Sequence, residues 1–80
     1  DNDEKSFSRA WQDMTVTAGL KMELAAHDTL EATAIDVSTD NGVVTLKGNV
    51  KNETERDLAV EMAKGYDKVV DVKDELVITN

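Results

Sequence analysis

The 80-residue chain has no cysteine, no proline and only three aromatic residues. Without cysteine there is no disulfide, no Cys-based zinc site and no thiol nucleophile, and the chain suits an oxidising or a reducing compartment equally well. Without proline, no rigid linker divides the chain. Its length therefore predicts one domain, with a small core that needs no metal or disulfide.

Long apolar runs are also missing. The longest fall far short of the roughly 20 residues that span a bilayer, so no transmembrane segment is predicted. No basic segment followed by an apolar run resembles an export signal, and we expect any such signal to have been removed or never present.

Basic residues are scarce: nine Lys and Arg stand against seventeen Asp and Glu, which gives a net charge of −8. This excludes nucleic acid as a partner, because such binding depends on Lys and Arg neutralising phosphates. It also argues against an anionic bilayer held by charge alone. We expect a well-solvated monomer.

Apolar residues alternate with polar ones between residues 34 and 50, which predicts two strands. The apolar positions are Ile35, Val37, Val44, Leu46 and Val50. Between the strands, Asn41 and Gly42 tolerate the positive φ that tight hairpin turns require. Gly48 falls on the apolar side of the second strand, where we expect a bulge or the close approach of a helix.

Residues 1–12 are predicted to be an N-terminal extension, partly disordered or a short helix, before a domain at residues 13–80. Phe7, Trp11 and Met14 recur at i, i+4 and i+7 and would share one helix face. In one interpretation the extension folds its aromatic residues back onto the domain as a staple. In the other they form an exposed contact for lipid headgroups or a partner, since Trp favours interfaces.

A first helix is predicted over residues 14–27, started by Asp13 or Thr15 as the N-cap. Its buried stripe comprises Val16, Leu20 and Leu24. Gly19 inside this helix indicates either close packing or a weak first turn. In the loop at residues 28–33, we expect Leu30 to lie beneath the hairpin.

A second helix follows an Asn52 cap with a Glu three residues later, and we expect Gly65 to end it in a left-handed conformation. Its predicted buried stripe comprises Leu58, Ala59, Met62 and Ala63. A last strand is predicted over residues 69–78. Asp74 falls on its apolar side, so we expect a bulge or bend near Lys73 and Asp74.

The predicted fold class is α+β: a two-layer sandwich in the order helix-strand-strand-helix-strand, with two helices on one face of a three-stranded sheet. The other face of the sheet is predicted to meet water, through Asp36, Ser38, Thr45, Lys47, Lys73 and Glu75.

The chain offers no catalytic constellation. A nucleophilic triad needs a histidine beside a nucleophile, and the single histidine, His27, is expected to have a surface or capping role. The run Asp36, Ser38, Asp40 fails the EF-hand pattern, because glycine comes one place late and the bidentate Glu is missing. No phosphate-binding loop is present. We predict no enzyme activity, no cofactor and no metal.

In order and spacing, several motifs resemble the BON domain family over about residues 13–78. They are V16-T-x-x-L20-K-x-x-L24, Ile35-x-Val37, the run from Asn41 to Gly48 with Val50, Thr54-Glu55 with A59-x-x-M-A63, and V69-x-x-V72 with Leu76-x-Ile78. The match is nearest to osmotically induced periplasmic members. One departure is Lys68, where the family usually has Gly before the valine that opens the last strand.

The resemblance implies a non-enzymatic module of the bacterial envelope, periplasmic or attached to a secreted or outer-membrane protein. It implies contact with phospholipid and a role in osmotic stress. Phe7, Trp11 and Met14 are the candidate contact residues. The alternative is a protein-interaction module that docks another envelope protein or a second BON domain.

Overall fold

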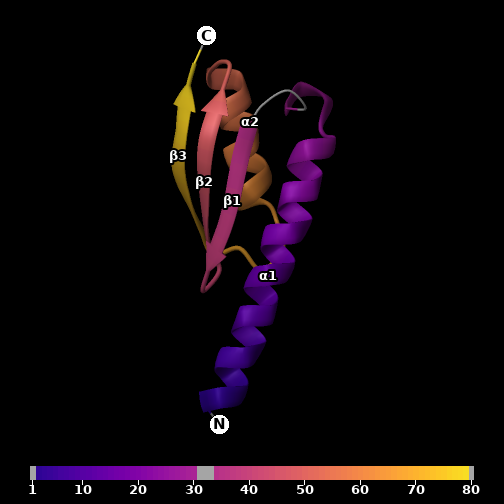
Figure 1. Cartoon of the computed structure of the whole chain (residues 1–80), viewed down its shortest axis with the longest axis vertical. Coiled ribbons are helices and arrows are strands. Elements are labelled where there is room, and N and C mark those ends of the chain that lie inside the picture. The colour runs from indigo at the N-terminus through magenta and orange to yellow at the C-terminus, as the bar shows by residue number, and fades with distance from the viewer. Residues whose placement is uncertain (1, 31–33, 80) are drawn as a thin grey trace.

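The computed structural model describes residues 2–30 and 34–79, with side chains from Ser8 onward. In chain order the elements are helix α1 (Asn2–Ala26), the short 3-10 helix η1 (Asp28–Leu30), strands β1 (Ala34–Asp40) and β2 (Val43–Val50), helix α2 (Glu53–Lys64) and strand β3 (Asp71–Ile78) (Figure 1). The predicted order of long helices and strands is confirmed.

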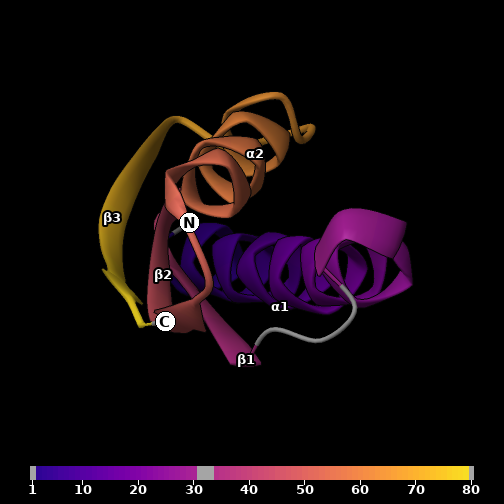
Figure 2. The same cartoon turned by 90° about the horizontal axis from the view of Figure 1, so that it is seen from above.

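The three strands form one sheet in the order β1-β2-β3. β1 and β2 run antiparallel, whereas β2 and β3 run parallel because α2 carries the chain back between them. Both α1 and α2 lie on the same side of the sheet (Figure 2). The predicted two-layer α+β sandwich is therefore confirmed.

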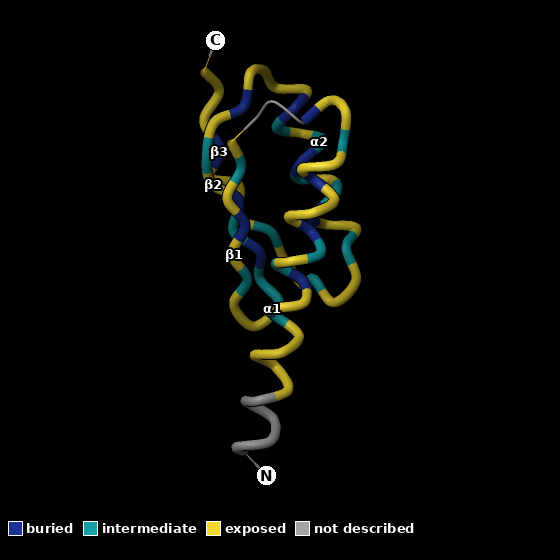
Figure 3. The backbone as a smooth tube through the Cα atoms, turned by 45° about the vertical axis from the view of Figure 1, so that its right-hand side comes forward, coloured by how far each residue is buried: buried dark blue, intermediate teal, exposed yellow. Residues whose placement is uncertain are grey.

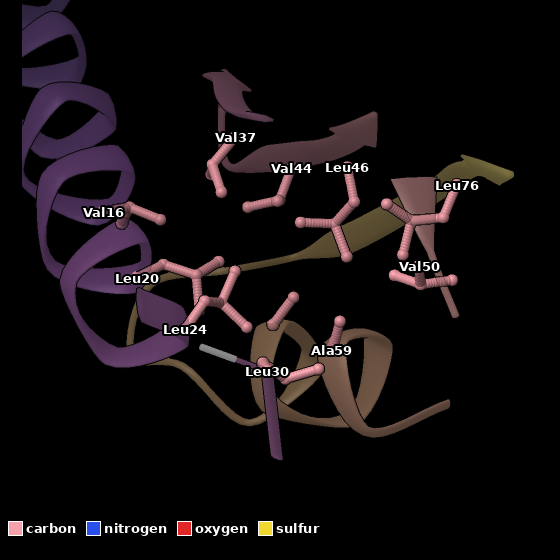
Figure 4. Close-up of a cluster of buried hydrophobic side chains, with 11 residues drawn as sticks. Val16, Leu20, Leu24, Leu30, Val37, Val44, Leu46, Val50, Ala59 and Leu76 are labelled. Atoms are coloured by element: carbon pink, nitrogen blue, oxygen red, sulfur yellow. The ribbon is translucent and has the colours of Figure 1, made fainter. Parts of the chain in front are cut away.

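The core lies between the sheet and the two helices, and side chains from every layer meet there (Figure 4). Its buried members are Val16, Leu20, Leu24, Leu30, Val37, Val44, Leu46, Val50, Ala59, Ala63 and Leu76. Burying each Leu or Val of this size contributes about 1.5–3 kcal/mol. The predicted stripe of α1 and the buried position of Leu30 are confirmed. In α2, Ala59 and Ala63 are buried, while Leu58 and Met62 pack at the margin.

The hairpin turn has the predicted geometry. Asn41 and Gly42 have φ values of 53° and 81°, so both central residues are left-handed, as a primed turn requires. At Gly48 the expectation was wrong in one respect, because the element that approaches closely is β1 and not a helix. Gly48 has φ 127°, and a Cβ there would overlap the backbone of Ala34. The pairing of β1 with β2 is continuous through Gly48, without a bulge.

α1 begins at Asn2, so the prediction that the first helix starts near Met14 was wrong. The chain contains no proline, and its first glycine is Gly19, so no helix-breaking residue precedes Met14. Neither expected cap acts as one. The Thr15 hydroxyl donates to the carbonyl oxygen of Trp11 inside the helix, and the Asp13 carboxylate binds the hairpin turn.

The N-terminal turns of α1 continue past the hairpin turn and away from the sheet (Figure 1), and the side chains described there are largely exposed (Figure 3). The backbone of residues 2–12 therefore continues α1 and does not fold back over the domain, while Trp11 lines a groove together with Tyr66. The division into an extension at 1–12 and a domain at 13–80 stays a prediction, since the helix crosses that point unbroken.

α2 begins as predicted. The Asn52 side chain accepts a hydrogen bond from the backbone N–H of Glu55 at 2.9 Å, and the Glu55 carboxylate accepts one from Lys51 N–H at 2.9 Å. The end of α2 differs from the prediction, because Gly65 has φ −85° and is right-handed. Its N–H still donates to Glu61 O at 3.0 Å. The left-handed turn comes three residues later, at Lys68, with φ 75°.

β3 begins at Asp71 and pairs with β2 without interruption, so the predicted start at 69 and the predicted bend near Lys73 and Asp74 were wrong. Asp74 lies at a partly exposed margin of the helix-covered face. There its carboxylate accepts from Leu76 N–H at 3.1 Å and lies 3.6 Å from the Arg56 guanidinium on α2. Because Asp74 is exposed, a regular strand leaves its carboxylate in contact with water, and Arg56 adds a partner of opposite charge.

The other face of the sheet is polar, as predicted. Asp36, Ser38, Lys47, Lys73 and Glu75 are exposed there, and Thr45 is half-buried. The Lys47 ammonium and the Glu75 carboxylate, which are direct partners in the β2–β3 register, lie 3.8 Å apart.

Candidate functional site

An exposed apolar stripe runs along α1 on the side opposite the core. The outer stripe comprises Trp11, Met14, Ala18, Met22 and Ala25. They recur every three or four residues, which places them on one side of the helix, whereas Val16, Leu20 and Leu24 lie on the other. Trp11, Met14 and Met22 are 56%, 63% and 73% exposed, so the outer stripe is open to a partner.

Of the three predicted contact residues, Trp11 and Met14 share this face. Phe7 lies in α1, but its side chain is outside the described residues. Sequence reasoning missed Met22, which extends the same spacing by eight residues from Met14. That spacing was visible in the sequence, and it identifies Met22 once the helix is known to be continuous.

The outer stripe carries no carboxylate. From Ser8 to Ala26, the positive Arg9 and Lys21 balance the negative Asp13 and Glu23. Neither carboxylate lies on the outer stripe. The Asp13 carboxylate binds the hairpin turn, and Glu23 lines a groove on another side of the helix. In a chain of net charge −8, the outer stripe itself therefore adds no negative charge that would repel an anionic surface.

That groove, with a volume of about 730 Å³, lies between α1 and the C-terminal end of α2 with the loop that follows it. Its walls include two of the three aromatic residues and three carboxylates. The aromatic residues are Trp11 and Tyr66, the carboxylates are those of Glu23, Glu61 and Asp67, and Met62 adds an apolar side chain. The groove combines aromatic side chains with negative charge, and both can attract cations.

A smaller hollow of about 290 Å³ adjoins the groove, with Gln12, Val16 and Lys68 lining both. Arg9 and Lys68 supply its positive charge, and Asp13 also lines it. The Asp13 carboxylate already accepts from Asn41 N–H at 2.8 Å and from Gly42 N–H at 3.0 Å. The hollow therefore offers two cations beside a carboxylate whose hydrogen bonds go to the hairpin turn.

Comparison with known proteins decides the family, because residues 12–80 match the model of the BON domain. The chain belongs to the BON domain family. This BON domain is 42% identical over 64 residues to the Osmotically-inducible protein Y of Escherichia coli (strain K12). The matched residues are 80% of the chain but 32% of that relative, so the chain spans about a third of the relative's length.

At Lys68, where the family resemblance predicts glycine, the backbone of this BON domain is left-handed. With φ 75°, Lys68 adopts the left-handed conformation that glycine occupies most easily. The turn forms with lysine at this position, and after it Val70 N–H donates to the carbonyl oxygen of Gly42 at 2.9 Å.

The single histidine of the BON domain has a structural partner. His27 Nδ1 accepts from Thr29 N–H at 3.2 Å, which caps the turn of η1. Among residues 2–30 and 34–79, no three His, Asp or Glu side chains come together as a metal site would require. Within the same residues, no helix combines the length and the apolar character needed to cross a bilayer.

Proposed function

We propose that this BON domain is a non-enzymatic module of the bacterial envelope that contacts phospholipid surfaces and supports tolerance of osmotic stress. Family membership and the likeness to an osmotically inducible protein support this proposal. The periplasmic side of the envelope is the proposed location.

One observation carries the contact with lipid: the outer stripe is apolar and free of carboxylates on a protein of net charge −8. Trp and Met side chains bury well at the boundary between headgroups and acyl chains. A helix lying in that plane buries one face along its length. Lys21, beside the outer stripe, is long enough to reach headgroup phosphates.

Flotation with phosphatidylcholine vesicles tests the proposal. Each buried Met contributes about 1.5–3 kcal/mol when fully removed from water, so Met14→Ser with Met22→Ser should weaken binding by tenfold or more. Trp11→Ala should also weaken it. Val77→Ser is the matched control, because Val77 is an exposed apolar residue on the open face of the sheet. Vesicle binding that is unaltered in the Met14/Met22 variant would disprove this contact.

A protein-interaction role is the second candidate, and the edge strand β3 favours it. β3 pairs only with β2 among the described strands, and Val70, Val77 and Ile78 are exposed at or beside it. Such an edge can take up a strand from another envelope protein or from a second BON domain. Capture of a periplasmic protein that is lost on Val77→Lys, with no flotation on vesicles, would favour this function.

A further inference from the structure

The groove and the adjoining hollow present opposite charges side by side. Glu23, Glu61 and Asp67 line the groove, whereas Arg9 and Lys68 line the hollow. The two share the side chains of Gln12, Val16 and Lys68, so one ligand of modest length can reach both.

The groove suits an organic ammonium group. Trp11 and Tyr66 both line it, and aromatic faces attract such cations through the ring quadrupole. Glu61 and Asp67 are exposed at its rim and add Coulombic attraction. The apolar part of the wall, which includes Val16 and Met62, accommodates the methyl or methylene groups of the cation.

The hollow suits the anionic part of the same ligand. The Arg9 guanidinium donates to the Asn41 side-chain oxygen at 3.4 Å and keeps further N–H donors. Lys68 lines both the groove and the hollow. The Asp13 carboxylate is engaged by two backbone N–H groups of the turn, which offset part of its repulsion toward an anion.

We infer that the groove and the hollow form one site for the headgroup of a zwitterionic phospholipid, with the ammonium in the groove and the phosphate in the hollow. Charge complementarity identifies the ligand, because a phosphate-only headgroup would leave the groove carboxylates unmatched. Continuity with the outer stripe points to a lipid as its source, since Trp11 belongs to both surfaces. This inference rests on the proposed function.

The first test is an NMR titration with two soluble short-chain lipids that differ only in the headgroup. Dihexanoyl phosphatidylcholine should shift the amide signals of Gly65 to Lys68 and the indole signal of Trp11. Dihexanoyl phosphatidylglycerol, which lacks the ammonium, should bind at least about fivefold more weakly, as loss of a cation–π contact with its paired charge implies. Equal binding of both lipids would overturn the inference.

Substitutions then test which residues bind the ammonium of the headgroup and which bind its phosphate. Glu61→Gln with Asp67→Asn should weaken binding of the choline lipid about fivefold or more, because two negative charges that attract the ammonium are removed. Asp36→Asn with Glu75→Gln removes the same charge from the open face of the sheet and should leave affinity unchanged. Lys68→Ala should weaken the binding of dihexanoyl phosphatidylcholine but leave the binding of free choline unchanged. If both double variants bind alike, the site is wrong.

Vesicle flotation separates failure of this site from failure of the proposed function. If wild-type protein floats with phosphatidylcholine vesicles but the NMR signals of the groove residues do not shift with the short-chain lipid, the headgroup site is wrong and the proposed function stands. If the groove signals shift but no vesicle binds, the site stands and the proposed membrane contact is wrong.

Discussion

The Asp13 carboxylate on α1 accepts a hydrogen bond from the backbone N–H of Gly42 at 3.0 Å, across 29 residues of sequence. Its second oxygen accepts from Asn41 N–H at 2.8 Å. One side chain thus binds both central N–H groups of the hairpin turn. This contact fixes the sheet against the part of α1 that carries the outer stripe.

We expect Asp13→Ala to lower the free energy of unfolding by about 2 kcal/mol, because two hydrogen bonds to a charged acceptor are lost. Urea denaturation followed by circular dichroism measures the change. Asp36→Ala is the control, since Asp36 is exposed on the open sheet face. Equal stability of the two variants would show that the Asp13 contact contributes nothing.

Lys68→Gly should stabilise the protein. A non-glycine residue in the left-handed region costs about 1–2 kcal/mol, and glycine loses about 0.5–1 kcal/mol more backbone entropy on folding, so a net gain of about 0.5–1 kcal/mol is expected. Thermal denaturation should show a higher midpoint. Lys21→Gly, the same change inside α1, should lower stability by about 1 kcal/mol. A lower midpoint for Lys68→Gly would contradict this explanation.

Gly19 and Tyr66 should be energetically coupled. A Cβ at position 19 would overlap the Tyr66 hydroxyl, so close packing explains the glycine inside α1. Gly19→Ala should therefore destabilise the wild type despite better helix propensity. In a Tyr66→Ala background the same change should stabilise by up to about 1 kcal/mol. A double-mutant cycle of unfolding free energies measures the coupling, and additive values would refute it.

Glu55 is the buried charged side chain among the described residues, at 6% exposure, and it holds the start of α2. Glu55→Ala removes the acceptor for Lys51 N–H and should lower stability by about 2 kcal/mol. Glu55→Gln keeps an acceptor and should lose less. Glu61→Ala, at an exposed position of the same helix, serves as the control. The urea midpoint should be lowest for Glu55→Ala, intermediate for Glu55→Gln and highest for Glu61→Ala. Any other order would argue against this role.

The features predictable from sequence are those encoded locally. Alternation over 34–50 and the Asn41-Gly42 pair specify the hairpin through nearest neighbours, and the Asn52 cap specifies where α2 begins. The buried stripe of α1 follows from helical periodicity alone.

Several of the errors involve partners distant in sequence. Asp74 stays exposed on a regular strand, where Arg56 approaches it from α2, and Gly48 is constrained by the backbone of Ala34. The left-handed turn belongs to Lys68, where the chain crosses to reach the hairpin. No local pattern reports such contacts.

The candidate sites divide in the same way. Periodicity was enough to place Trp11 and Met14 on one face, and it reaches Met22 once α1 is continuous. The groove could not be predicted, because Glu61 and Tyr66 meet Trp11 only when α2 packs beside α1.

The parallel pairing of β2 with β3 also affects how the protein is made. During synthesis, the nascent domain exposes β2 with one unpaired edge until Asp71–Ile78 has emerged, and Leu76 is missing from the core until then. An unpaired edge of this kind invites association between incomplete chains. Within this domain, β3 is thus the strand that closes the sheet, and it follows every other element of the fold in the sequence.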